Sequence, residues 1–132
     1  MTFIGLNPST ADETKDDRTI SKCIGFAQRN DCEAIEMLNL FAFRATKPND
    51  MKAADDPVGP ENDAILLSRA REARIVVACW GVDGHFMSRE ATVRKMLHDA
   101  GIRLKCLGTT QRGLPRHPVM RAYDAEIIDF PG

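Results

Sequence analysis

Short apolar runs with β-type residues alternate along this chain with runs whose apolar residues recur at helical spacing. The β-type runs cover residues 2–6, 34–40, 75–80 and 104–107. The helical runs between them cover residues 18–29, 60–73 and 93–100. Such alternation builds a mostly parallel sheet with right-handed crossovers and helices on both faces. We therefore predict one α/β domain over residues 1–132, a three-layer α/β/α sandwich around a short, mostly parallel, four-stranded sheet.

Local signals place some of the element ends. Asp16 and Asp17 precede the first helical run and are candidate caps. Pro60, followed by acidic residues, predicts the start of the second helix, and Gly101 predicts the end of the third. For residues 122–130 we expect a short helix or an edge strand.

The connection over residues 41–59 is longer than the usual link of about 4–6 residues. A loop of this length beside the ends of strands is often a lid or a binding loop. Part of it, residues 49–54, is expected to form one helical turn.

Composition excludes several classes of protein. Lys+Arg number 18 against 19 Asp+Glu, so the net charge of −1 does not favour binding to DNA or membrane by bulk charge alone. No apolar run approaches the ~20 residues of a membrane-spanning helix, and no signal-peptide pattern opens the chain. The four cysteines have no CxxC spacing, so we expect reduced core thiols in a cytoplasmic protein and no membrane partner.

Unusual polar residues gather where the predicted strands end. They are the residues 7–12 after the first strand, 39–46 after the second, Trp80-Gly81 after the third, and His117-Pro118 beyond the fourth. Ligands of open parallel sheets bind outside the carboxyl ends of the strands. These four segments, remote in sequence, are therefore expected to share one ligand-binding rim.

The first of these segments allows several kinds of chemistry. Asp12, Asp16 and Asp17 suit a general base, a stabiliser of a cationic sugar, a shared metal ion, or solvated caps of the next helix. Ser9 and Thr10 suit a phosphate contact or simple turn formation.

The next two segments offer a cation and aromatic rings. Arg44 suits a forked contact to phosphate or carboxylate, or an ion pair with residues 55–56. Phe41 or Phe43 suits stacking on a base, or alternatively one of the two belongs to the core. Trp80 suits an aromatic wall for a planar ligand, or packing beside a tight turn.

Positive charge dominates the last part of the chain. Its basic residues, with no acid before Asp124, are Arg103, Lys105, Arg112, Arg116 and Arg121. Such a loop at a crevice suits the backbone of a nucleic acid or a polyphosphate, although charge runs are usually solvated surface. No paired His or Cys spacing occurs, so we expect no transition-metal site and no cofactor.

Six blocks of sequence together resemble an uncharacterised bacterial family, domain of unknown function 1643. The blocks lie at residues 3–12, 16–19, 39–46, 56–59, 80–81 and 115–118 and extend over nearly the whole chain. Members of this family usually carry a segment before the first strand, and we expect this chain to lack it because Met1 adjoins that strand.

Two motifs resemble the uracil-DNA glycosylase superfamily more distantly. Gly5-Leu6-Asn7-Pro8 is similar to the Gly-x-Asn-Pro of mismatch-specific uracil glycosylases, in which the Asn positions the attacking water. His117-Pro118 is similar to the His-Pro of the second glycosylase motif, in which the His meets the base carbonyl and the following loop enters the minor groove. Val119 stands where that motif has Ser, and Ser9 stands where the first motif has Gly.

These resemblances imply a base- or nucleoside-directed hydrolase of glycosylase type with a uracil-DNA glycosylase-like fold. The catalytic residues would be Asn7, His117, Asp12 and Asp17, and the ligand-binding residues Ser9, Thr10, Asn39, Phe41, Arg44, Trp80 and Arg116. Two alternatives stay open. One is a non-catalytic module that binds a nucleotide or nucleic acid, and the other is a metal-dependent phosphoryl hydrolase that uses Asp12, Asp16 and Asp17.

Overall fold

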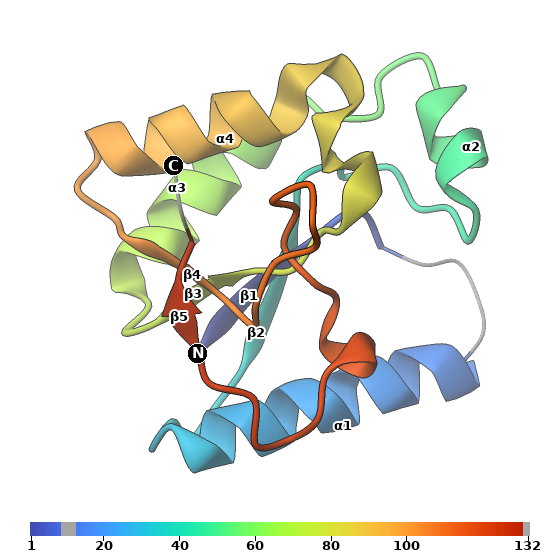
Figure 1. The fold of residues 1–132 in the computed structure, drawn as a ribbon. Helices are drawn as coiled ribbons and strands as arrows, with labels where there is room; N and C mark the ends of the chain where they lie inside the picture. Colours follow the sequence, from blue (N-terminus) through green and yellow to red (C-terminus); the bar gives the residue numbers. More distant parts are fainter. Residues whose placement is uncertain (9–12, 131–132) are drawn as a thin grey trace.

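The computed structural model describes residues 1–8 and 13–130 (Figure 1). Its strands are β1 (Thr2–Gly5), β2 (Glu36–Asn39), β3 (Val76–Ala78), β4 (Leu104–Cys106) and β5 (Ile128–Asp129). Its helices are α1 (Glu13–Arg29), α2 (Pro48–Lys52), α3 (Asn62–Glu72) and α4 (Arg89–Asp99). Two 3₁₀ segments are η1 (Val82–Ser88) and η2 (Pro118–Met120).

The strands form one five-stranded sheet in the order β2-β1-β3-β4-β5. Strands β2, β1, β3 and β4 are parallel to one another, as predicted, and β5 is antiparallel to β4. The predicted count of four strands is therefore wrong by one edge strand, in the tail where a short helix or edge strand was expected. A strand of only two residues is too short to show an alternating pattern, which is why the sequence signal was weak.

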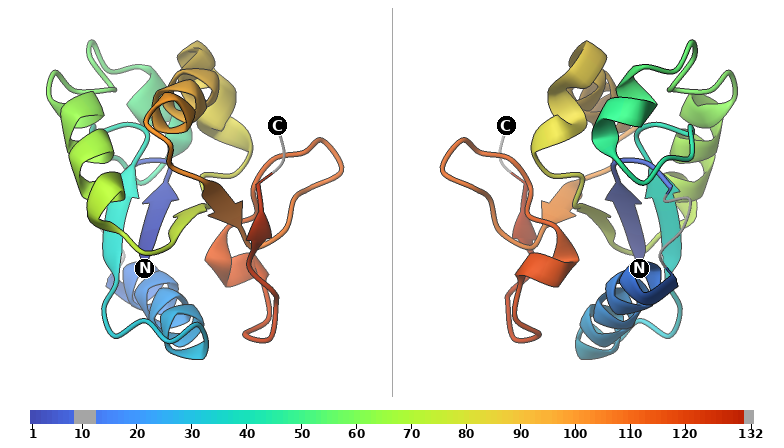
Figure 2. Two further views of the ribbon diagram at one scale, coloured as in Figure 1. Left: turned by 90° about the vertical axis from the view of Figure 1, so that its left-hand side faces the viewer. Right: turned by 90° about the vertical axis from the view of Figure 1, so that its right-hand side faces the viewer.

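Helices cover both faces of the sheet (Figure 2). Successive side chains of a strand point to opposite faces, so Phe3 and Ile4 of β1 enter different cores. Phe3 packs with Cys23 and Phe26 of α1, and Ile4 belongs to the core with Leu66 of α3 and with α4. The α/β class and the helices on both faces are confirmed.

Some predicted helix ends are wrong. Helix α1 begins at Glu13, so Asp16 and Asp17 lie inside it and are not caps. Helix α3 begins at Asn62, two residues after Pro60. Acidic residues are favoured at a cap and in the first turn alike, so their presence does not fix where a helix begins.

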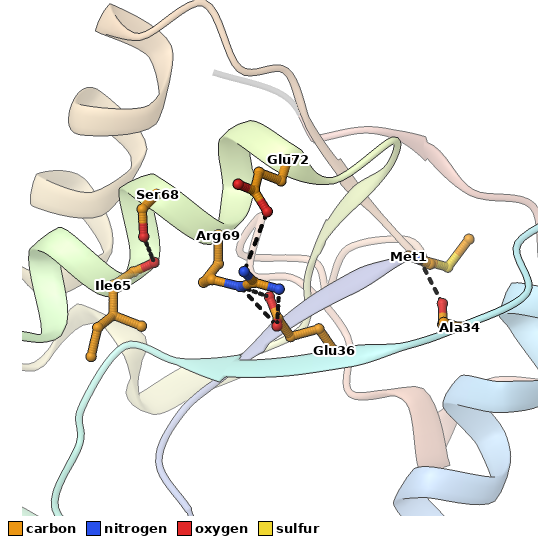
Figure 3. A network of polar contacts seen from close by, with 7 residues as sticks. All are labelled: Met1, Ala34, Glu36, Ile65, Ser68, Arg69 and Glu72. Carbon is orange, nitrogen blue, oxygen red and sulfur yellow. Dashed lines mark hydrogen bonds and ion pairs between the residues drawn. The ribbon is translucent and has the colours of Figure 1, made fainter.

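A polar network joins α3 to the edge strand β2 (Figure 3). Arg69 Nε donates to both carboxylate oxygens of Glu36 at 2.9 Å, and its Nη1 lies 3.3 Å from Glu72. The amino group of Met1 donates to the Ala34 carbonyl at 2.9 Å, and Glu36 N donates to the Met1 carbonyl at 3.0 Å. The Arg69 bonds fasten α3 to β2, and the two Met1 bonds align the start of β2 beside β1.

Two expectations about the class of the protein can be checked on this fold. All four cysteines are buried and free, as predicted. Among residues 1–8 and 13–130, no helix has the length and apolar character that crossing a membrane requires.

Candidate functional site

The order of the strands reverses between β1 and β3. From β1 the chain moves to β2 on one side, and it then crosses to β3 on the other. In doubly wound sheets the ligand crevice lies outside the carboxyl ends of the two strands that flank such a point. Segments 6–8 and 79–81 follow these two strands, and segment 40–45, which follows β2, is bonded to residues 5–8. We call these three segments together the β1/β3 rim.

Asn7 joins two segments of this rim through its side-chain amide. Its Nδ2 donates to the carbonyl oxygens of Pro8, Phe43 and Ala45 at 3.1, 3.2 and 2.9 Å. The Ala45 amide donates in turn to the Pro8 carbonyl at 2.9 Å. Because all three partners of the side chain are acceptors, the NH₂ group must face them. Its Oδ1 accepts no hydrogen bond from the described residues, so Asn7 combines a structural contact with an acceptor that a ligand or water can use.

Two buried side chains hold the segment that follows β2. Asn62 Nδ2 donates to the Asn39 and Leu40 carbonyls at 3.0 and 2.9 Å. Arg89, only 4% exposed, donates from Nε to the Leu40 carbonyl at 2.7 Å, and its Nη1 pairs with Asp63. A buried charge persists only with such partners. No sequence motif marks Asn62 or Arg89, so neither residue was predicted at the site. Asn39 itself is half-buried at the end of β2.

The aromatic residues of the rim divide into core and surface. Phe41 is fully buried with its ring 5.8 Å from that of Phe86, whereas Phe43 is 43% exposed. Trp80 is 3% exposed and packs edge-on against Phe130 at 5.7 Å. Phe43, and neither Phe41 nor Trp80, therefore has a ring face open to a ligand. The expected ligand contacts of Phe41 and Trp80 are therefore not available, because both rings are buried in the core.

The long connection is packed against the rest of the domain. Helix α2 confirms the expected helical turn near residues 49–54, and its Met51 is fully buried in the core. Lys52 Nζ pairs with Asp83 of η1 at 2.8 Å. Through Met51 and Lys52, the long connection over residues 41–59 is therefore held against the core and η1.

A β-hairpin carries His117 toward β3. Thr109 and Pro115 form an antiparallel bridge, and we call residues 109–115 the 109–115 hairpin. Gly81, which follows β3, donates from its amide to the Pro115 carbonyl at 3.1 Å. Its φ of 74° is a conformation that favours glycine. His117 thus comes two residues after a segment bonded to the β1/β3 rim, although β4 is the strand that precedes it.

The ring of His117 is held as one tautomer. Its Nδ1 accepts a hydrogen bond from the Val119 amide at 3.2 Å, so the neutral ring carries its proton on Nε2. Partial desolvation lowers the pKa of His117 although the side chain keeps access to solvent. At neutral pH the residue is therefore an uncharged donor at Nε2.

Arg116 and Arg121, the arginines near His117, each donate one hydrogen bond to a backbone carbonyl. Arg116 Nε donates to the Thr109 carbonyl at 3.1 Å, and Arg121 Nε donates to the Leu107 carbonyl at 2.8 Å. Both brace the hairpin and the chain after it, which leaves their Nη groups for further contacts. Arg44 is exposed on the segment after β2 and also has an interaction partner.

Several predicted site residues cannot be placed. Ser9, Thr10 and Asp12 lie outside the described residues, and for Asp16 and Asp17 only the backbone position within α1 is described. Among the described side chains, no group of three or more His, Cys, Asp or Glu residues is arranged to hold a metal ion.

Comparison with known proteins gives one match. A family model described as "Protein of unknown function (DUF1643)" matches residues 1–119, from before β1 into η2. No curated protein and no solved structure matches the chain. The match spans the four parallel strands, the β1/β3 rim and His117. The chain therefore belongs to the DUF1643 family.

Proposed function

We propose that this protein is a glycosylase-type hydrolase that breaks the N-glycosidic bond of a nucleoside or nucleic acid at the β1/β3 rim. The observation that carries the proposal is the neutral Nε2–H of His117, set by the bond from the Val119 amide. A departing base gains negative charge on its carbonyl oxygen, and a fixed neutral donor stabilises that charge as it develops.

Asn7 suits the other half of such a reaction. Its Nδ2 is occupied by backbone carbonyls, and its Oδ1, which has no donor among the described residues, can accept a hydrogen bond from the attacking water and orient it. An amide is too weakly basic to deprotonate water, so this role fits a reaction in which the bond to the base breaks first. In this proposal Asp12 and Asp17 supply carboxylates that stabilise the cationic sugar, within a uracil-DNA glycosylase-like fold.

The surface after His117 supports a nucleic acid as the substrate. Val119 and Met120 are 38% and 71% exposed on η2, and Arg116 and Arg121 flank them. Apolar side chains beside arginines are typical of loops that enter a minor groove. The buried, free cysteines suit a reducing compartment, so we propose that the protein acts in the cytoplasm.

The test is a base-release screen in the presence of EDTA. Uracil-containing DNA, single-stranded and double-stranded, and a panel of modified nucleosides are incubated with the protein, and the free base is quantified. We expect turnover without metal and a loss of about 10²–10³ in rate for His117→Ala, the usual effect of removing one such donor. His117→Gln, which keeps an N–H donor, should retain more activity than His117→Ala.

Other outcomes favour the alternatives. Stoichiometric binding without base release would favour a non-catalytic binding module. Phosphate release that requires Mg²⁺ would favour a phosphoryl hydrolase that uses Asp12, Asp16 and Asp17. Full base release by both His117 variants would reject His117 as the catalytic donor.

A further inference from the structure

A groove lies between α4 and the 109–115 hairpin. Its volume is about 400 Å³, within the range of roughly 300–1,000 Å³ for small-molecule sites, and its lining includes His85, Ser88, Glu90, Arg94, Arg112 and Leu114. After the hairpin the chain turns toward α1, where Lys22 Nζ donates to the Arg121 carbonyl (Figure 1). The groove is therefore separate from the surface of η2 and is not used in the proposed glycosylase chemistry.

The charges in this groove do not cancel. Glu90 and Arg94 pair with each other at 3.3 Å, so together they contribute little net charge. Arg112 is exposed and makes no ion pair or hydrogen bond with the described residues. Its guanidinium is thus left as an uncompensated cation with forked N–H donors, the geometry that matches phosphate.

The hairpin presents Arg112 from a rigid tip. Thr110 N donates to the Leu114 carbonyl at 2.8 Å, and Gly113 N donates to the Thr110 carbonyl at 2.9 Å. Leu114 N also donates to Thr110 Oγ1 at 3.2 Å, and Gly113 has a φ of 81°. The tip is closed by its own hydrogen bonds, so a ligand need not order it on binding.

Two more polar groups face this groove from η1. His85 Nδ1 donates to the Val82 carbonyl, since only a donor can satisfy that oxygen, and this leaves Nε2 for a ligand. The Ser88 hydroxyl makes no capping bond to α4 and is exposed. Leu114 and Ala91 supply apolar surface beside these groups.

We propose that this groove binds a phosphorylated small molecule of about mononucleotide size. Arg112 and the Ser88 hydroxyl bind the phosphate group, and the surface at Leu114 and Ala91 contacts the organic part. Because the volume exceeds what a bare phosphate needs, the organic part contributes to affinity.

The test is a titration of the ¹⁵N-labelled full chain followed by amide chemical shifts. Adenosine 5′-monophosphate, adenosine and inorganic phosphate are the three probes. We expect saturable shifts at Gly113 and Ser88 with the monophosphate, and much weaker binding of adenosine and of phosphate alone. Arg112→Gln should weaken monophosphate binding by at least about tenfold, the usual loss for a hydrogen bond to a charged group.

The matched control is Arg71→Gln, which removes the same charge from the exposed surface of α3. It should bind the monophosphate as the unchanged protein does. Absence of shifts at Gly113 and Ser88 would overturn the proposal, as would an equal loss in both variants, which would indicate bulk charge. Equal affinity for inorganic phosphate and the monophosphate would also overturn it, by showing a site for the bare anion. None of these outcomes bears on base release at the β1/β3 rim, so this proposal and the glycosylase proposal fail separately.

Discussion

Asn7 has a structural role and a proposed chemical role, carried by different atoms of one amide. Its Nδ2 holds together the segments after β1 and β2, and its Oδ1 accepts no hydrogen bond from residues 1–8 or 13–130. His117 differs, because the one side-chain hydrogen bond that it makes with the described residues joins it to a residue only two positions away. The two residues should therefore respond differently to truncation.

We predict that Asn7→Ala lowers the free energy of unfolding by about 1–3 kcal/mol, because the Phe43 and Ala45 carbonyls lose the Nδ2 donor, whereas the Pro8 carbonyl keeps the Ala45 amide. His117→Ala should cost less than about 1 kcal/mol, since one partly exposed amide loses a weak partner. Urea denaturation of the three proteins measures both values. An Asn7→Ala protein as stable as the unchanged chain would show that this network carries no stability.

The thiols should be unreactive in the folded protein. Burial raises the pKa of Cys23 to about 12, and burial also raises the pKa of Cys79 and of Cys106. The thiolate is the reactive form, so these groups should react with a disulfide reagent only after unfolding. Titration of native and denatured protein tests this, and three or four fast-reacting thiols in the native protein would contradict the burial.

At the scale of elements, the long periodic runs were predictable and the short irregular ones were not. The four parallel strands and the cores of α3 and α4 follow from apolar spacing, because that spacing is what burial requires. Segment η1 and the 109–115 hairpin depend on tertiary contacts such as the bond from Gly81 to Pro115, which no local pattern records.

Some features of the candidate site were likewise predictable from the sequence, and others depend on tertiary packing. That the segments after the strands share one rim follows from parallel pairing alone. Which of Phe41 and Phe43 faces outward, and that buried Arg89 and Asn62 hold the rim, depends on packing that the sequence does not encode locally. Asn7 and His117 were predicted at the rim from their places after the strands, whereas their catalytic roles came only from the resemblance.

Gly84 of η1 packs closely against Trp80, which follows β3. A Cβ added to Gly84 would lie 2.2 Å from Cδ1 of Trp80, which is buried and cannot move aside. Gly84→Ala should therefore destabilise the protein by about 1–3 kcal/mol, as overpacking usually does. Trp80 is the single tryptophan, so its fluorescence during denaturation reports on this contact directly. An unchanged transition and spectrum would contradict this packing.

At the scale of the whole molecule, the balance of charge limits how nucleic acid can bind. With 18 Lys+Arg against 19 Asp+Glu, long-range attraction is weak, so under the proposed function local contacts from Arg116 and Arg121 beside η2 would supply the phosphate binding. Each neutralised phosphate contributes about −0.7 to the slope of log affinity against log salt for single strands.

We predict modest affinity for single-stranded DNA that falls as salt is raised, with a slope reduced by about one phosphate contact in Arg116→Gln. Fluorescence anisotropy with a labelled oligonucleotide at several salt concentrations gives these slopes, and Arg71→Gln again serves as the charge-matched control. Equal affinity at all salt concentrations would reject contacts to the backbone.

We infer that the fold holds His117 as a neutral Nε2–H donor, two residues after Pro115, whose carbonyl accepts from Gly81 of the β1/β3 rim. Desolvation lowers its pKa below the ordinary value of 6.5, so the folded protein binds this proton less tightly than the unfolded chain does. Its contribution to stability is therefore full above pH 6.5 and declines as the pH falls through the lowered pKa.

The most direct measurement is the ¹⁵N spectrum of the His117 ring across a pH titration, assigned by comparison with His117→Gln. We expect the Nε2–H tautomer at neutral pH and a pKa below 6.5 for this ring. An Nδ1–H tautomer, or a pKa above 6.5, would show that the fold does not hold His117 as a neutral Nε2–H donor.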